Sequence, residues 1–156
     1  MYDFLYYQVR DVMVIALVTV TSETTIGRAE AIFEEHDFNG LPVVDKTGRL
    51  AGLVTKLDVL RAFAFRSQSK VPEYEAIMGR QVWEIMTREP RTVDPFTPLT
   101  RVIGTMVETG FKSLPVVEGG RLEGMVARED VLRALRLAAQ GQGPDRVREA
   151  GFPGRS

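Results

Sequence analysis

Residues 38–62 read FNGLPVVDKTGRLAGLVTKLDVLRA, and residues 111–134 read FKSLPVVEGGRLEGMVAREDVLRA. The second stretch repeats the first with one residue fewer in its turn. A related lead-in precedes each copy, QVRDVM at residues 8–13 and QVWEIM at residues 81–86. A repeat of about 55 residues is long enough for one supersecondary unit but marginal as an independent core. We therefore expect one pseudo-symmetric globule whose functional sites lie where the halves meet.

The composition is that of a globular chain. Of the 156 residues 44% are hydrophobic, which supports a sizeable core, and the net charge is −1. This balance, without a basic stripe, argues against a nucleic-acid partner. No apolar run approaches the ~20 residues that cross a bilayer, so we predict no membrane segment. The N-terminal stretch MYDFLYYQVRD does not read as a secretory signal, and we expect a cytoplasmic protein.

The sequence offers little for catalysis. It contains no Cys, which removes disulfides, thiolate nucleophiles and Cys-ligated metals. The single histidine, His36, cannot form a histidine-cluster metal site, and we interpret it as a surface or half-buried helix residue. Asp58 and Asp130 could in principle form an acid/base pair, but no nucleophile or metal cluster accompanies them. We predict no catalytic residue, no metal site and no enzyme activity.

Each half predicts the same order of elements: a helical lead-in, a short strand, a helix, two strands and a closing helix. In the second half Thr97-Pro98 reads as a helix start with Thr97 as N-cap, and apolar residues follow at helical spacing. The LPVV runs suit buried strands. The hairpin turns fall at Lys46-Thr47-Gly48 and Gly119-Gly120.

The repeats set the expected boundaries. Residues 1–68 are the first repeat with its lead-in helix, 69–79 a linker, 80–139 the second repeat, and 140–156 a flexible C-terminal tail without periodicity. An apolar cluster ahead of the first repeat favours core packing of an extra helix, with a dimer contact as the alternative. Its members are Tyr2, Phe4, Leu5, Tyr6 and Tyr7.

The strongest local motif is Thr55-Lys56-Leu57-Asp58, where a strand meets a helix. As a structural feature it is a capping box, in which Thr55 caps the helix and Asp58 reaches back. As a functional feature, a hydroxyl and a carboxylate at this place can hold a ribose diol, and the helix start favours a nearby phosphate. The second copy keeps Asp130 but has Ala127 in place of the threonine.

A second motif lies just before each LPVV strand. It is Phe38-Asn39-Gly40 in the first half and Phe111-Lys112-Ser113 in the second. Lys112 can meet a phosphate as a point charge, whereas Asn39 offers neutral hydrogen bonds. The alternative interpretation for both residues is an exposed turn.

The two copies resemble a tandem pair of CBS domains, the module named after cystathionine β-synthase and also called a Bateman module. The matching features are the lead-ins ending in Val-Met or Ile-Met, the Thr-Val strands, LPVVD and LPVVE, the Gly-Arg-Leu hairpins, GLVT and GMVA, and the closing DVLRA helices. The resemblance covers residues 8–138. It implies an α/β (α+β) fold of two pseudo-symmetric β-α-β-β-α repeats packed sheet to sheet, with two clefts that commonly bind adenosine-containing ligands.

The resemblance also implies a role for individual residues. In cleft 1, Thr55 and Asp58 hold the ribose, Leu53, Val93 and Phe111 flank the base, Thr92 and Asp94 lie at its polar edge, and Lys112 and Asn39 meet the phosphate. In cleft 2, Asp130 holds the ribose, Met125, Val20 and Phe38 surround the base, Thr19 and Thr21 lie at its edge, and Arg128 adds a cation. Because Ala127 departs from the family pattern, cleft 2 lacks one ribose contact.

Several functions are compatible with this resemblance. The leading hypothesis is a regulatory adenine-nucleotide sensor, for AMP above ADP and ATP, that acts on a separate effector protein. The alternatives are a binder of S-adenosylmethionine or NAD, and a structural module that dimerises with empty clefts. The resemblance and the apolar helix faces predict a homodimer.

Overall fold

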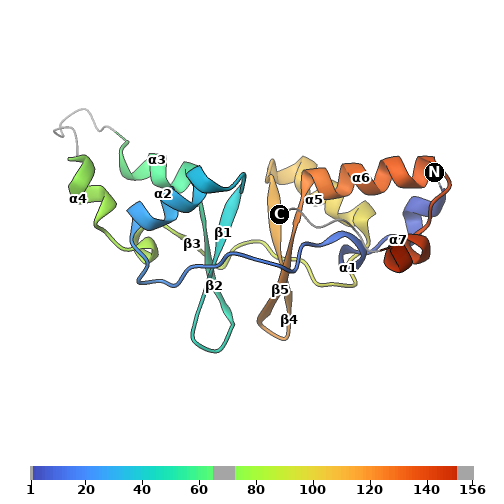
Figure 1. Ribbon diagram of the computed structural model, residues 1–156, viewed down its shortest axis with the longest axis horizontal. Coiled ribbons are helices and arrows are strands. Elements are labelled where there is room, and N and C mark those ends of the chain that lie inside the picture. The colour runs from blue at the N-terminus through green and yellow to red at the C-terminus, as the bar shows by residue number, and fades with distance from the viewer. Residues whose placement is uncertain (1, 65–72, 151–156) are drawn as a thin grey trace. The chain divides into compact units, whose positions relative to one another are not determined.

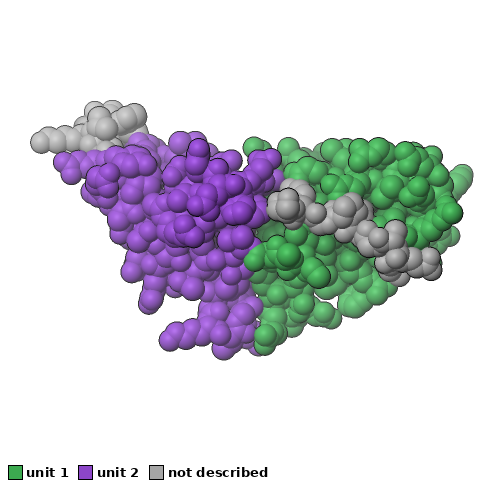
Figure 2. Space-filling model, in the orientation of Figure 1, with its two compact units in different colours: residues 1–17, 91–156 green, residues 18–90 purple. Residues whose placement is uncertain are grey.

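The computed structural model describes residues 2–64 and 73–150, with the side chains of 148–150 left aside, and it confirms a mixed helix and strand fold with two small sheets (Figure 1). The chain divides into two compact units (Figure 2). Unit 1 comprises residues 1–17 and 91–156, and unit 2 comprises residues 18–90. The helices are η1 (Tyr2–Tyr6), α1 (Val9–Val12), α2 (Ile26–Glu35), α3 (Lys56–Ala62), α4 (Tyr74–Met78), η2 (Val82–Glu84), α5 (Leu99–Thr109), α6 (Arg128–Ala139) and α7 (Pro144–Ala150), where η marks a 3-10 helix. The strands are β1 (Gly40–Val44), β2 (Leu50–Thr55), β3 (Thr87–Arg88), β4 (Ser113–Glu118) and β5 (Arg121–Ala127).

Unit 2 is built on the β1–β2 hairpin. The two strands pair antiparallel from Gly40 opposite Thr55, and the short strand β3 adds to the other edge of β2. The strand predicted around Val20 is a single parallel bridge to Val43. The core combines the bridge residue Val20 with apolar residues from α2, both hairpin strands, α3, α4 and the lead-in of the second repeat: Val20, Ile26, Ala29, Ile32, Phe33, Leu41, Val43, Val54, Val59, Ile77 and Val82.

Unit 1 repeats this plan around the β4–β5 hairpin. Ser113 pairs with Ala127 at one end of the hairpin, and Val93 makes the parallel bridge to Val116. The hairpin turn is Gly119-Gly120, and both residues have positive φ, which glycine adopts at no steric cost. The core contains Phe4, Tyr7, Val9, Val12, Leu99, Val102, Met106, Leu114, Val116, Val126, Val131, Ala134, Ala138 and Val147.

The lead-in of each repeat pairs with the other repeat. The backbone of Val9 donates to Thr97 O at 2.9 Å, and that of Val82 donates to Thr24 O at 2.7 Å. In both lead-ins an acidic side chain caps the first turn, because Asp11 accepts from the amide of Gln8 and Glu84 from that of Gln81. The compact units are therefore not the two sequence repeats, since each unit contains the lead-in of the other copy.

Two segments differ from their predicted character. The span 69–79, expected to be a linker, contains α4, whose Ile77 is buried against α2. The span 140–156, expected to be a flexible tail, contains α7, with Val147 in the core of unit 1. Both helices are short, so their few apolar residues leave little helical periodicity to read. Residues 151–156 of the predicted tail lie outside the described residues.

The N-terminal apolar cluster is divided between core and surface. Phe4 and Tyr7 are buried in unit 1, which agrees with core packing. Tyr2, Leu5 and Tyr6, on the other side of η1, are exposed. The 3-10 helix therefore buries one side of the cluster and presents the other to solvent.

Candidate functional site

The Thr55–Asp58 pair forms a complete capping box where β2 meets α3. Oδ2 of Asp58 accepts hydrogen bonds from the Thr55 amide at 2.8 Å and from its hydroxyl at 3.0 Å. The amide of Asp58 donates back to the Thr55 hydroxyl at 3.2 Å. Asp58 is 3% exposed. The structural interpretation of this motif is therefore confirmed, and the same arrangement orients a hydroxyl and a carboxylate together.

Arg61 is a neighbour of this pair that the motif alone did not reveal. Its Nη1 lies 3.3 Å from Oδ1 of Asp58, while its side chain is largely exposed. The signal in the sequence was the spacing, since residues three apart share a helix face. The carboxylate of Asp58 thus contacts a cation through one oxygen and the capping groups through the other.

The second copy of the motif is half a capping box. Oδ2 of Asp130 accepts from the Ala127 amide at 2.8 Å, and Asp130 is 1% exposed. Ala127 has nearly the same backbone angles as Thr55, φ −117° and ψ 166° against −118° and 165°. Only the hydroxyl is missing, so the two junctions match in backbone and differ in one polar group.

The loop before each hairpin lies beside the strand–helix junction of its own repeat. In unit 2, Gly40 pairs with Thr55, which brings Phe38 and Asn39 to that junction. Phe38 stacks on His36, with ring centroids 4.9 Å apart. His36 is half-buried and follows the last residue of α2, in keeping with its interpretation as a residue at a helix end.

In unit 1 the equivalent loop is bound by Arg128. Its amide donates to Lys112 O at 3.1 Å, and its guanidinium donates to the carbonyl oxygens of Phe111 at 3.1 Å and Gly110 at 2.5 Å. Phe111 and Lys112 are exposed. The structure thus brings together two residues predicted for cleft 1, Phe111 and Lys112, and one predicted for cleft 2, Arg128.

The residues predicted at the edges of the bases lie beside the two isolated bridges. Val20 is buried in the core of unit 2, and Val93 packs partly against the core of unit 1. Their neighbours Thr19, Thr21, Thr92 and Asp94 are exposed. Asp94 Oδ1 accepts from the Phe96 amide at 2.8 Å, so this carboxylate closes a local turn.

The predicted residues divide evenly between the units. Unit 2 holds Thr19, Val20, Thr21, Phe38, Asn39, Leu53, Thr55 and Asp58. Unit 1 holds Thr92, Val93, Asp94, Phe111, Lys112, Met125, Arg128 and Asp130. Each predicted cleft draws on both sets. Within each unit, the loop before the hairpin and the strand–helix junction form one polar cluster.

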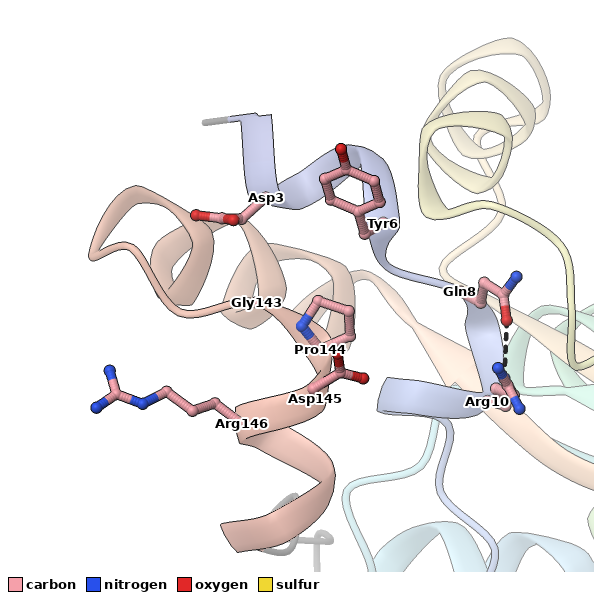
Figure 3. Close-up of a pocket in the computed structure, with 8 residues that line it drawn as sticks. All are labelled: Asp3, Tyr6, Gln8, Arg10, Gly143, Pro144, Asp145 and Arg146. Carbon is pink, nitrogen blue, oxygen red and sulfur yellow. Dashed lines mark hydrogen bonds between the residues drawn. The ribbon is translucent and has the colours of Figure 1, made fainter.

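A surface pocket of about 540 Å³ lies elsewhere in unit 1, between η1, α1 and the start of α7 (Figure 3). None of the predicted site residues lines it. Its charged side chains point in different directions, and Arg10 is bonded to the Gln8 side chain at 2.7 Å. The lining residues are Asp3, Tyr6, Gln8, Arg10, Gly143, Pro144, Asp145 and Arg146. This mixture of signs does not select one class of ligand.

The described residues also bear on metal binding and on membrane insertion. Among residues 2–64 and 73–150, no three His, Cys, Asp or Glu side chains are placed to share a metal ion. In the same part of the chain, no helix has the length and apolar character needed to cross a bilayer.

Comparison with known proteins gives consistent matches to one domain. A family model described as the CBS domain matches residues 9–65 and 82–137. A CBS domain-containing protein of Dictyostelium discoideum is 32% identical over 130 residues, which cover 81% of this chain and 90% of that protein. Some other curated relatives are longer, and the chain spans 42% and 33% of two of them.

Two solved structures with similar folds are complexes with adenosine-type ligands. The structure of CBSX2 in complex with AMP has a TM-score of 0.73 and 30% identity, covering 85% of this chain and 98% of that one. The CBS domain pair of protein MJ0100, in complex with 5′-methylthioadenosine and S-adenosyl-L-methionine, has a TM-score of 0.69 and 29% identity, covering 84% and 97%.

Proposed function

The chain belongs to the CBS-domain family, with two copies of the domain, and from this premise we propose that it is a regulatory module that binds an adenine nucleotide. AMP is the first candidate ligand. The module has no catalytic activity of its own and passes its signal to a separate effector protein. The adenosine-containing ligands of two similar solved structures support this ligand class.

The observation that carries the proposal is the paired hydroxyl and carboxylate of Thr55 and Asp58 at the end of β2. A carboxylate offers about four lone-pair sites. Asp58 can therefore accept hydrogen bonds from a ribose diol while it keeps the hydrogen bond from the Thr55 amide. The exposed Arg61 side chain can move away from Oδ1 to make room. Ribose is therefore the part of the ligand that this junction recognises.

The remaining contacts of the proposed site divide by chemistry. Leu53, Val93 and Phe111 flank the adenine, and Thr92 and Asp94 bond to its polar edge. Lys112 and Asn39 meet the phosphate. One ammonium suits a monophosphate better than a triphosphate, because each further phosphate adds negative charge. This balance favours AMP over ATP.

The second cleft is proposed to be the weaker one. It has Asp130 without the hydroxyl of a threonine, with Met125, Val20 and Phe38 at the base, Thr19 and Thr21 at its edge, and Arg128 nearby. Val20 is buried in its own unit, so it reaches a base less readily than an exposed side chain. Binding is therefore expected to favour the Thr55–Asp58 cleft.

We further propose that the module acts as a homodimer in the cytoplasm. Large apolar side chains are exposed on the two closing helices, Leu57 and Leu60 on α3 and Leu132 on α6. Leu60 and Leu132 occupy matching positions in the two repeats, and exposed apolar side chains of this kind suit a symmetric interface between two copies. Sedimentation at micromolar concentration tests this proposal, and a single species of about 17.4 kDa contradicts it.

Two alternatives remain within the same fold. S-adenosylmethionine would use the same ribose contact without depending on Lys112, because it has no phosphate, whereas NAD carries a diphosphate that Lys112 could meet. A structural module would dimerise without any ligand. Calorimetric titration with adenosine, AMP, ADP, ATP, NAD and S-adenosylmethionine separates these possibilities, because the ligand bound most tightly identifies the class and a structural module binds none of them.

Substitution of Asp58 is the direct test of the proposed site. A hydrogen bond to a charged group contributes about 1.5–3 kcal/mol, so Asp58→Ala should weaken AMP binding about tenfold or more. Thr55→Ala removes a neutral partner and should weaken it less. Asp130→Ala, the matched change in the other repeat, is the control. The assignment fails if Asp58→Ala binds AMP normally while Asp130→Ala does not bind it.

A further inference from the structure

Arg128 joins the start of α6 to the end of α5. It is the first residue of α6, and Gly110, the C-cap residue that follows α5, has the left-handed φ of 73°. The last carbonyl groups of a helix lack partners within the helix and carry partial negative charge. Through its amide and guanidinium, Arg128 donates to three consecutive carbonyls, those of Gly110, Phe111 and Lys112. The Arg128 side chain therefore restrains Gly110 and Phe111, which lead directly into Lys112, and the Arg128 amide holds the carbonyl of Lys112 itself.

The matching residue of the other repeat makes a different contact. Lys56 is the first residue of α3, and its ammonium lies 6.0 Å from the centroid of the Phe33 ring. An ammonium is a compact charge, whereas a guanidinium is a planar fork that can bond two acceptors at once. The loop before β1 is supported instead by the stacked rings of His36 and Phe38. The two loops are thus held by different means.

We propose that Arg128 is a positioning residue, which holds residues 110–112 so that the ammonium of Lys112 is presented to the phosphate of the ligand. This inference rests on the proposed nucleotide site. The guanidinium remains bonded to the end of α5 and does not itself bind the phosphate. Holding the loop in its binding conformation before the ligand arrives lowers the entropy that binding loses. Arg128 therefore acts on the contacts that residues 110–112 make, the phosphate contact of Lys112 first and the base contact of Phe111 with it. The ribose contact of Thr55 and Asp58 is left unchanged.

The experiment compares affinities for AMP and adenosine, which differ by the phosphate. Lys112→Gln should reduce the preference for AMP about tenfold, as expected for one charged contact. Arg128→Gln should reduce the preference for AMP about three- to tenfold. The affinity for adenosine should fall by a smaller factor, because only the base contact of Phe111 is affected. The double variant should lose no more of the preference for AMP than Lys112→Gln alone, because the effects of coupled residues are not additive. Lys56→Gln, at the matched position, should leave the preference unchanged.

Arg128→Lys separates positioning from direct charge attraction. A lysine keeps the positive charge but lacks the rigid planar fork that donates to both carbonyls in one geometry, so it should behave like Arg128→Gln. Amide hydrogen exchange of residues 110–113 should accelerate in both Arg128 variants and remain unchanged in Lys112→Gln, provided that thermal melting shows all variants folded. This exchange measurement needs no ligand and applies even to a weakly binding variant.

The possible outcomes separate a failure of the positioning role of Arg128 from a failure of the proposed nucleotide site. A wild-type preference for AMP in Arg128→Gln or Arg128→Lys overturns the positioning role and leaves the nucleotide site intact. Additive losses in the double variant, or unchanged exchange at residues 110–113, also overturn it. A wild-type protein that binds neither AMP nor adenosine overturns the proposed function, and the positioning role falls with it.

Discussion

Val14 and Met125 exchange two backbone hydrogen bonds, at 2.8 Å from the Val14 amide and at 3.0 Å from the Met125 amide. The first residue belongs to the lead-in of one sequence repeat and the second to the hairpin of the other. Thr87 and Leu53 pair antiparallel in the reciprocal position of unit 2. Each lead-in therefore pairs with the hairpin of the other repeat. The stability of each hairpin consequently depends on a distant part of the chain.

This close pairing requires the glycine beside Met125. A Cβ added at Gly124 would lie 2.7 Å from Val14 O, a distance that forces the backbone to shift. Gly124→Ala should lower the free energy of unfolding by about 1–3 kcal/mol, the usual cost of overpacking. Chemical denaturation followed by circular dichroism measures the change.

Gly104 provides the matched control for that substitution. It lies within α5, and a Cβ there meets nothing within 4 Å. Gly104→Ala should raise stability by about 0.5–1 kcal/mol, because alanine restricts the unfolded chain and favours helix. Equal effects at Gly104 and Gly124 would contradict the close approach of Val14.

The exchange of lead-ins also predicts how fragments behave. Residues 81–140 contain the second repeat but lack Phe4, Tyr7, Val9 and Val12, which are buried in its core. This fragment should not fold cooperatively, because a chain of about 60 residues without those contacts cannot offset the entropy of the chain. A chain that joins residues 1–17 by a flexible linker to residues 91–150 should melt cooperatively. Cooperative melting of 81–140 alone would refute the dependence on the N-terminal segment.

The repeat pattern predicted the hairpins and the capping box because these features are local. LPVV, the glycine turns and Thr55-x-x-Asp58 each specify their structure within a few residues. The start of α5 was predicted less accurately from the same local pattern. Pro98 is the N-cap residue, and the Thr97 hydroxyl accepts from the Asp94 amide at 3.2 Å, so the prediction of Thr97 as N-cap was wrong.

The first repeat has the same arrangement in the structure. Thr97 aligns with Thr24 of the first repeat, whose hydroxyl accepts from the Thr21 amide in the same way. The cap of α2 is the next residue, Thr25. Contacts such as Arg128 to the end of α5 were not predictable in this manner, because they join residues whose distance in space depends on the tertiary packing of two helices.

The missing hydroxyl of the second junction can be restored. Ala127 has the backbone angles of Thr55, so Ala127→Thr should complete the capping box and raise stability by about 0.5–2 kcal/mol. If the ribose contact is as proposed, the variant should also bind AMP more tightly in the second cleft. Calorimetry of Ala127→Thr should then show tighter AMP binding in the second cleft. Ala127→Val, which has a similar shape but no hydroxyl, should show no such gain.

Tyr7 links the N-terminal segment to the segment before α7. The residue is fully buried, and its hydroxyl donates to Gln142 O at 2.9 Å. Burial raises the pKa of Tyr7 above its usual 10.0, and the nearby charges of Asp11 and Asp3 add to the effect. Because the folded protein binds this proton more tightly, the resulting stability is fully present below pH 10 and is lost as the pH rises toward the raised pKa.

Tyr7→Phe isolates that contribution. Near neutral pH the variant should be less stable by about 0.5–1.5 kcal/mol, the net value of one hydrogen bond. Above pH 10 the wild type should lose stability faster than the variant, because the phenylalanine has no proton to release from the buried site. Urea denaturation at pH 7 and at pH 10.5 measures both effects. A wild type and a variant that decline in parallel above pH 10 would show that Tyr7 does not carry the alkaline transition.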